Sequence, residues 1–258
     1  MRLKEQNKGI SIANIRAWAL VCVVLGIGAI AVVLRGLLQV DMVSPEADQV
    51  MGLFSEDQTR TYVVIALICL AVETCAVPMF CLMLVEGSYR TLDLGKYIMR
   101  TLLVAVASEV PYDFATTGQI LDLTNLNPAF GTTIALVMLY FFLRYSDRSV
   151  GHYILRSVIT FAAMLWTGIF NITQGPCIVL IAAVLWTFWN KPLWRSIMGT
   201  VACLVCAVLI SPFYIAAPLS MILLYFYRGE KGSDYKWGRL VAYPLILLLA
   251  GVIHRFIH

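Results

Sequence analysis

The chain has 258 residues, of which 60% are hydrophobic and 13% charged, and its mean hydropathy is +0.83. A soluble domain is typically about half apolar and about a quarter charged, so this composition excludes a soluble protein and indicates an integral membrane protein. The formal net charge is +4, and the basic residues are dispersed without interleaved aromatic residues, which excludes a nucleic-acid-binding surface.

Continuous apolar stretches predict the membrane-spanning elements. A span needs roughly 17–25 predominantly apolar residues, and its backbone polar groups must be satisfied within the segment, so each stretch is expected to be a helix. The runs do not alternate as the strands of a membrane barrel do. We therefore predict an all-α fold, a polytopic transmembrane bundle of about nine helices (8–10) that forms a single integral membrane domain over residues 1–258. The predicted spans are 17–38, 62–85, 97–114, 128–143, 151–170, 174–189, 194–210, 213–227 and 239–257.

Two features of the connections complete this prediction. Lys and Arg gather in alternate connections, Arg156 and Arg195 among them, whereas the others hold only Arg35, Arg60 and Arg255. The positive-inside rule then predicts a cytoplasmic N-terminus and an external C-terminus. The acidic connection 40–60 is expected outside, where it could form a short interfacial helix. Prolines leave open whether 194–227 forms two spans or one broken helix pair.

Five charged residues at membrane depth or at the end of a span are candidate functional residues. A charge at membrane depth costs at least ~2.5–3.5 kcal/mol, so it is expected to face protein or a cavity. Structural roles are the alternative: a hydrogen-bonded acid within the bundle, an arginine that reaches the cytoplasmic surface, or acids at the outer interface. The five residues are Glu73, Glu86, Arg100, Glu109 and Asp113.

Two local expectations follow from these positions. Glu109 and Asp113 are four residues apart and would share one helix face. Pro111 lies between them, and we expect it to open the helix end and free carbonyl groups near the two acids. Arg100 is expected to point into the bundle and pair with Glu86 or Glu73, because an unpaired guanidinium is costly there.

The cysteines predict neither disulfides nor a metal site. All seven fall inside spans, and an odd number of buried thiols is not a disulfide framework. Cys203 and Cys206 share a helix face, but packing explains this pair better than metal binding does.

Residues 77–115, "VPMFCLMLVEGSYRTLDLGKYIMRTLLVAVASEVPYDFA", resemble the signature region of the TraX family. That family comprises polytopic bacterial membrane proteins grouped with membrane acyltransferases, and its namesake acetylates the N-terminus of conjugative pilin. The resemblance implies a bacterial cytoplasmic (inner) membrane protein and acetyl-CoA as a possible acetyl donor. The matching residues are Pro78, Phe80, Glu86, Gly87, Tyr89, Thr91, Lys96, Tyr97, Arg100, Ser108, Glu109, Pro111, Tyr112 and Asp113.

The chain also departs from the family pattern, mainly where that pattern has histidine or aspartate. Gly26-Ile27 stands for an Asp-His pair, Glu73-Thr74 for Gly-Arg, Arg90 for a His, and Ile246 for the His of a Tyr-Pro-x-His motif. Acyl transfer needs a general base, and His is the usual one. The three histidines present, His152, His254 and His258, lie outside the family motifs.

Three functional hypotheses follow. In the first, the chain is a divergent member that lost or weakened acetyl transfer and acts as a membrane-embedded binding or assembly subunit with a membrane-protein partner. In the second, it is an active acyltransferase whose catalytic candidates are Glu73, Glu86, Glu109 and Asp113, with Arg90, Lys96 and Arg100 binding the CoA phosphates. In the third, Glu73, Glu109 and Asp113 form the ion path of a transporter or channel component.

Overall fold

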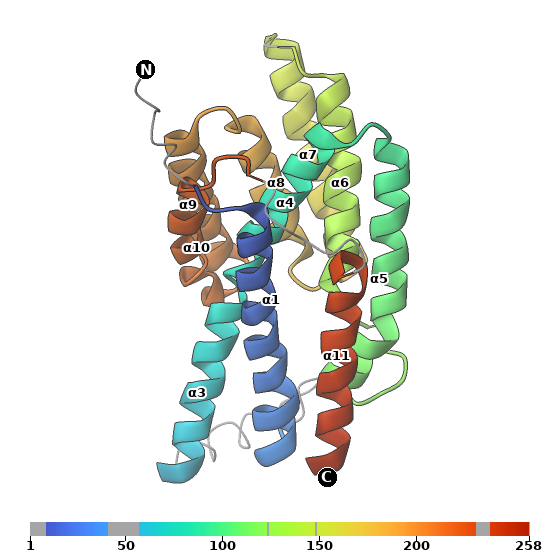
Figure 1. Ribbon diagram of the computed structural model, residues 1–258, viewed down its shortest axis with the longest axis vertical. Helices are drawn as coiled ribbons and strands as arrows, with labels where there is room; N and C mark the ends of the chain where they lie inside the picture. The colour runs from blue at the N-terminus through green and yellow to red at the C-terminus, as the bar shows by residue number, and fades with distance from the viewer. Residues whose placement is uncertain (1–8, 41–56, 123, 148, 231–237, 258) are drawn as a thin grey trace, which may run out of the picture.

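The computed structural model describes residues 9–40, 57–122, 124–147, 149–230 and 238–257 (Figure 1). Throughout these residues the regular elements are helices. Two isolated β-bridges also occur, one between Ile10 and Tyr227 and one between Leu126 and Ile172. The predicted all-α bundle is therefore confirmed. The interfacial helix considered for 40–60 falls mostly outside the described residues.

Each predicted span coincides with a helical segment. Side-chain caps at Ser11, Asp93, Asn127 and Ser149 fix several helix starts, because each side chain accepts a backbone N–H of the first turn. The elements are α1 (Ile12–Gly28), its π-helical continuation η1 (Ala29–Leu37), α3 (Asp57–Glu73), α4 (Ala76–Arg90), α5 (Leu94–Thr116), α6 (Pro128–Arg144), α7 (Val150–Ile169), α8 (Gly175–Thr187), α9 (Pro192–Leu209), the 3-10 turn η2 (Pro212–Ile215), α10 (Pro218–Tyr225) and α11 (Gly238–Ile257).

Two of the predicted spans are broken helices. The stretch 62–85 is interrupted between α3 and α4, where the Thr74 hydroxyl contacts the Ala71 carbonyl at 2.7 Å and the Phe213 carbonyl at 3.1 Å. The stretch 213–227 forms η2 and the short α10, each of which begins at a proline, and α10 packs against α9. Hence 194–227 is one full helix followed by a broken one.

The helices differ in how far they can cross a bilayer. Among the described segments, Ile12–Leu37, Thr59–Arg90 and Pro192–Leu209 are long and apolar enough to span it. At 1.5 Å per residue, α8 covers only about 20 Å and α10 about 12 Å of a hydrocarbon core about 30 Å thick. In Figure 1 the lower ends of α8 and α10 stop near the junction of α3 and α4, while α1 with η1, α3 and α11 extend further.

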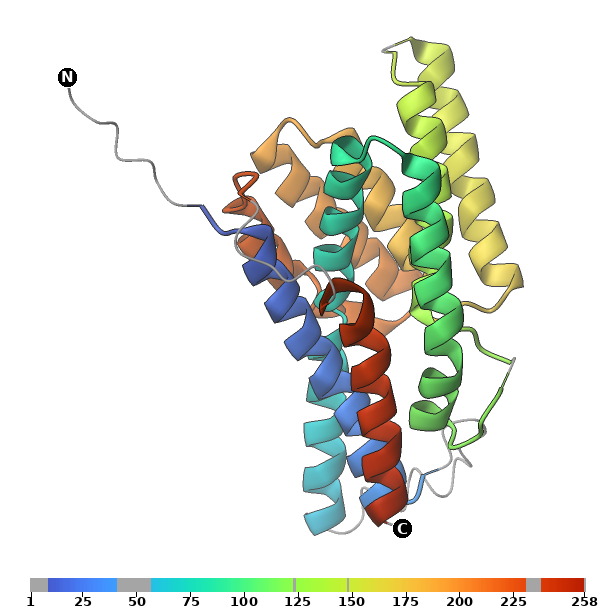
Figure 2. The same ribbon diagram turned by 45° about the vertical axis from the view of Figure 1, so that its right-hand side comes forward.

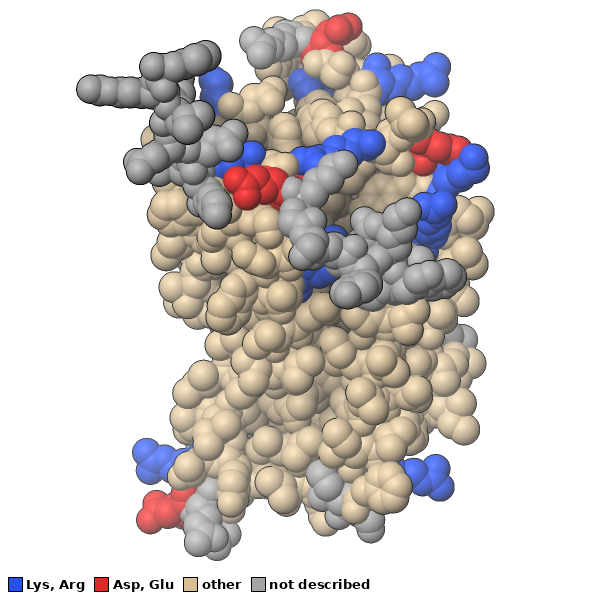
Figure 3. Space-filling view, in the orientation of Figure 1, with Lys and Arg blue, Asp and Glu red and all other residues tan. Residues whose placement is uncertain are grey.

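Charge and packing agree with this arrangement. Figure 3 shows charged side chains at the two ends of the molecule, with an uncharged belt between them. The first turn of α1 and the last turn of α11 lie at opposite ends, and α11 lies beside α5 (Figure 2). The side that faces the cytoplasm remains the prediction made above. The core is centred on α4, α6 and α8, with Leu82, Leu136, Leu139, Ile181 and Leu185 fully buried.

Candidate functional site

Glu86 is buried near the end of α4, in contact with two partners. Only 4% of the residue is exposed. One carboxylate oxygen lies 2.5 Å from Nη2 of Arg90, one helical turn on, and the other accepts a short hydrogen bond from the Tyr227 hydroxyl. Arg90 also donates to the Gly229 carbonyl at 2.5 Å. Oε1 of Glu86 thus has an ion pair with Arg90 but accepts no hydrogen bond, whereas Oε2 accepts one from Tyr227, and the charge of the acid is balanced.

Arginine and aromatic side chains surround this acid. Arg195 is 4% exposed, donates to the Leu224 carbonyl at 2.9 Å, and holds its guanidinium 5.3 Å from the ring centre of Trp189. Tyr89 stacks on Trp186 with ring centres 6.3 Å apart. Cation–π contacts of this kind contribute roughly 0.5–2 kcal/mol each. The positive-inside argument counted Arg195 with a cytoplasmic connection, although it falls within the predicted span 194–210, and the structure buries it in α9.

The glycine next to Glu86 is explained by helix packing. A Cβ at Gly87 would lie 2.7 Å from Cε1 and Oη of Tyr97, so this position lets the ring of Tyr97 on α5 pack against α4. The other predicted phosphate-binding residues do not gather around Glu86. Lys96 pairs with Asp93 at 3.0 Å, and Arg100 is exposed with no ion-pair partner in the described part of the chain. The expected pairing of Arg100 with Glu86 or Glu73 is wrong, because Arg90 occupies Glu86 instead.

At the other end of α5, Glu109 holds the start of α6. Its Oε2 accepts the backbone N–H of Asn127 at 3.2 Å and a short hydrogen bond from the Asn127 side chain. Asn127 is fully buried, also donates to the Ala105 carbonyl at 2.9 Å, and caps α6 by accepting the N–H of Ala129. Glu109 therefore joins α5 to α6.

Asp113 holds the connection that follows α5. It is 1% exposed, and its Oδ2 accepts the backbone N–H of Asp122 at 2.8 Å. The expectation that Pro111 opens the helix end is wrong, because α5 runs through it to Thr116. A proline removes one donor, and neighbouring groups in a membrane bundle can satisfy the freed carbonyl. Asp113 and Glu109 thus hold the backbone at Asp122 and at Asn127.

Glu73 differs from the other three acids. It is the last residue of α3, at the break before α4, and is half-buried. Within the described residues it has neither a hydrogen bond nor an ion pair. Its carboxyl lies directly on Gly26 of α1, and a Cβ there would fall within 2.5 Å of the Glu73 Cβ. Tyr112 and Tyr243 lie within electrostatic range of both Glu73 and Glu109.

The predicted site residues thus form three separate groups. Glu86 and Arg90 share one end of the bundle, Glu73 lies at the α3–α4 break, and Glu109 and Asp113 anchor the loop after α5. Imidazoles join none of these groups where the structure is described: His152 faces Asp147 at 3.7 Å, and His254 contacts the Ala31 carbonyl at 3.0 Å. A cluster of three or more metal-ligating His, Cys, Asp or Glu side chains is also absent from the described residues.

Sequence reasoning missed three residues that complete these groups, namely Tyr227, Asn127 and Arg195. Asn127 carried a signal, because Asn followed by Pro is typical of a helix cap and first turn. The Glu86–Arg90 spacing of four residues was a second signal.

Comparisons with known proteins identify the family. Neither a curated protein nor a solved structure matches the chain. The model of one family, described as TraX protein, matches residues 49–254, a stretch that includes all four candidate acids and Ile246. α1 lies before this stretch, so the comparison of Gly26-Ile27 with the family pattern depends on the resemblance alone. Because the match covers most of the sequence, the chain belongs to the TraX family.

Proposed function

We propose that this chain is a TraX-family protein of the bacterial inner membrane that has lost or weakened acetyl transfer and works as a membrane-embedded binding or assembly subunit. The observation that carries the proposal is the state of Glu86, the acid at the end where acetyl-CoA would be met. Arg90 and Tyr227 occupy its two oxygens. To accept a proton from an acceptor amine, this carboxylate would have to give up one of the two partners that it already has.

The other candidate residues support the same proposal. Glu109 and Asp113 accept backbone N–H groups that fix the connection after α5, which is a structural role. The same contacts count against an ion path through these acids. Lys96 pairs with Asp93, so the basic residues proposed for CoA phosphates are not gathered into one site. The partner of such a subunit would be another membrane protein.

Glu73 favours an active acyltransferase as the second candidate. Its carboxyl lies on Gly26, the position where the family pattern has Asp, so a carboxyl group is kept there on the facing helix. In this reaction the acceptor amine attacks the thioester carbonyl, a C–N bond forms and the C–S bond breaks. Glu73 takes the amine proton, and the CoA thiolate leaves and is protonated by solvent.

A transfer assay separates the two candidates. Purified wild-type protein and Glu73→Gln are incubated with labelled acetyl-CoA and cell-envelope extract, after thermal unfolding shows that both are folded. We expect no transfer by either protein. Losing a positioned proton-transfer group typically costs about 10²–10⁴-fold in rate, so transfer that disappears in Glu73→Gln would overturn the proposal and identify Glu73 as the base. Transfer that survives the change would also overturn it and point to another residue.

A further inference from the structure

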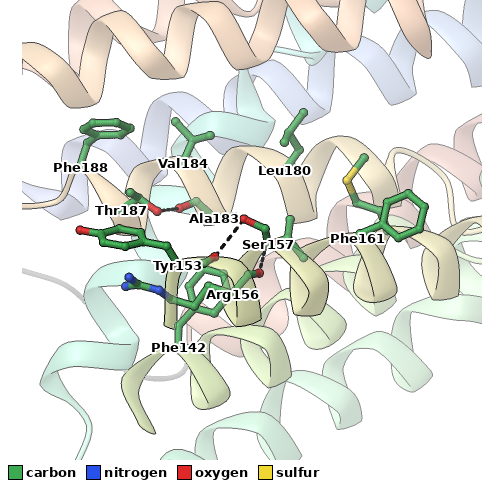
Figure 4. Close-up of a pocket in the computed structure, with 12 residues that line it drawn as sticks. Phe142, Tyr153, Arg156, Ser157, Phe161, Leu180, Ala183, Val184, Thr187 and Phe188 are labelled. Atoms are coloured by element: carbon green, nitrogen blue, oxygen red, sulfur yellow. Dashed lines mark hydrogen bonds between the residues drawn. The ribbon is translucent and has the colours of Figure 1, made fainter. Parts of the chain in front are cut away.

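A lipid-facing groove lies apart from the candidate acids, between α6, α7 and α8. It encloses about 380 Å³. Its walls are largely apolar, with Phe142 on α6, Phe161 on α7, and Leu180 and Phe188 on or beside α8 (Figure 4). The groove opens beside a face of α7 whose apolar side chains are more than half exposed, as expected where a helix meets lipid.

One cation lines this groove, and it is buried. Arg156 is 8% exposed, and its guanidinium carbon lies 4.5 Å from the ring centre of Tyr153 and 5.2 Å from that of Trp186. Its Nε donates to the His152 carbonyl at 3.2 Å. Nη2, in contrast, is buried without any hydrogen-bond acceptor in the described chain, and no carboxylate there pairs with the guanidinium. The positive-inside argument counted Arg156 with a cytoplasmic connection, although it falls within the predicted span 151–170, and it lies inside α7.

This arrangement calls for an anion. A buried guanidinium with an unsatisfied donor is unfavourable, and cation–π contacts offset only part of that cost. Three hydroxyl groups of the groove are already used: Ser157, Thr160 and Thr187 each donate to a carbonyl of their own helix, at 3.0, 2.8 and 2.8 Å. Figure 4 shows the bonds of Ser157 and Thr187 as dashed lines to Tyr153 and Ala183 of their own helices. Arg156 therefore provides the charge that would select a ligand.

The shape of the groove indicates the rest of the ligand. Arg156 lies six residues into α7, or about 9 Å from its start, a depth that a phosphate headgroup can reach. The lining continues to Met164, eight residues and about 12 Å further into the membrane. An anionic head with a hydrocarbon chain matches both parts of the groove.

We propose that the α6–α8 groove is a binding site for an anionic phospholipid, with the phosphate at Arg156 and an acyl chain along Phe161 and Leu180. The proposal does not depend on whether the chain transfers acetyl groups. Free phosphate shares the headgroup chemistry but not the chain, so the experiment must separate these two sources.

Native mass spectrometry of the detergent-purified protein can test the site. The protein is titrated with phosphatidylglycerol or phosphatidylcholine, and Arg156→Gln is compared with Arg144→Gln, which removes an exposed arginine at the end of α6. We expect wild type and Arg144→Gln to prefer phosphatidylglycerol, and Arg156→Gln to bind it about tenfold or more weakly, the usual effect of losing a charge-assisted hydrogen bond. Equal binding by all three proteins, or equal losses in both variants, would overturn the proposal.

Two further measurements separate lipid from phosphate and binding from folding. Leu180→Trp should fill the groove and weaken phosphatidylglycerol binding while leaving the headgroup contact in place. Displacement of the lipid by inorganic phosphate at matching concentrations would contradict a lipid site and indicate a phosphate site. Should Arg156→Gln fail to fold, Arg156→Lys replaces it as the test, because lysine retains the positive charge and is expected to keep the preference for phosphatidylglycerol. A folded Arg156→Lys that has lost this preference completely would contradict recognition of the lipid by charge.

Discussion

Replacing Gly26 by alanine tests the contact that sets Glu73 apart. The added Cβ would fall on the Glu73 carboxyl and within 2.5 Å of the Glu73 Cβ. Rotating the carboxyl cannot relieve the second contact, because Cβ is fixed to the backbone. Helices α1 and α3 must therefore separate locally. Overpacking of this kind typically costs about 1–3 kcal/mol.

Thermal unfolding in detergent measures this cost. For a chain of this size each kcal/mol corresponds to roughly 2–4 °C, so Gly26→Ala should lower the Tm by about 2–12 °C. Gly28→Ala is the matched control, because it lies in the same helix with no atom within 4 Å of an added Cβ. It should leave the Tm unchanged or raise it slightly, since alanine favours helix over glycine by about 1 kcal/mol.

The double variant Gly26→Ala with Glu73→Ala completes the test. Removing the Glu73 side chain beyond Cβ should recover part of the lost stability, with a coupling of about 0.5–3 kcal/mol between the two sites. Equal Tm values for Gly26→Ala and Gly28→Ala would refute the contact. Strictly additive effects in the double variant would show that the Glu73 carboxyl does not meet the new methyl group, because Glu73→Ala removes the carboxyl and keeps Cβ.

Three further predictions use the same unfolding measurement. Gly87→Ala should destabilise the protein by about 1–3 kcal/mol, because the new Cβ meets Tyr97 at 2.7 Å. Gly151→Ala is the control and should not destabilise it, because no atom lies within 4 Å of its added Cβ. Equal changes in Tm for the two variants would contradict this packing. Asn127→Ala should lower the free energy of unfolding by about 2–5 kcal/mol, because it removes the α6 cap and the side-chain hydrogen bond donated to the buried Glu109 carboxylate. A loss below about 1 kcal/mol would argue against that role. The pKa of Asp93 is held below its usual range because its carboxylate accepts the Lys96 N–H, so the stability that Asp93 contributes is present at neutral pH and is lost as the pH falls below about 4. Asp93→Ala should therefore have a lower Tm than wild type at pH 7 and the same Tm in acid. A Tm difference that does not change with pH would contradict the ionic role.

The overall fold could be predicted because a membrane leaves few alternatives. Continuous apolar runs must form helices, and the positions of those runs locate the helices directly. The break between Glu73 and Ala76 was not predicted, although Pro78 in the first turn of α4 is a sequence signal for a helix start. It depends on the Thr74 hydroxyl contacting a carbonyl of η2, far away in the sequence.

The candidate site was only partly predictable, because burial and pairing depend on which face of each helix meets a neighbour. Single-sequence reasoning identified Glu73, Glu86, Glu109 and Asp113 as unusual, and the structure explains three of them by local partners. It could not show that Arg100 points outward, since the facing of α5 is set by Tyr97 packing on α4. Nor could it show that Glu73 meets Gly26, a contact between two helices.

Carbodiimide labelling tests most directly the claim that three acids serve the structure and that Glu73 alone is available. A hydrophobic carbodiimide such as dicyclohexylcarbodiimide reacts with an accessible protonated carboxyl, whereas a carboxylate held in an ion pair or by backbone N–H groups is protected. Peptide mass spectrometry of the labelled, folded protein should find the adduct on Glu73 and not on Glu86, Glu109 or Asp113. Labelling of Glu86 with Glu73 unmodified would contradict the account, because Glu86 would then be the free acid.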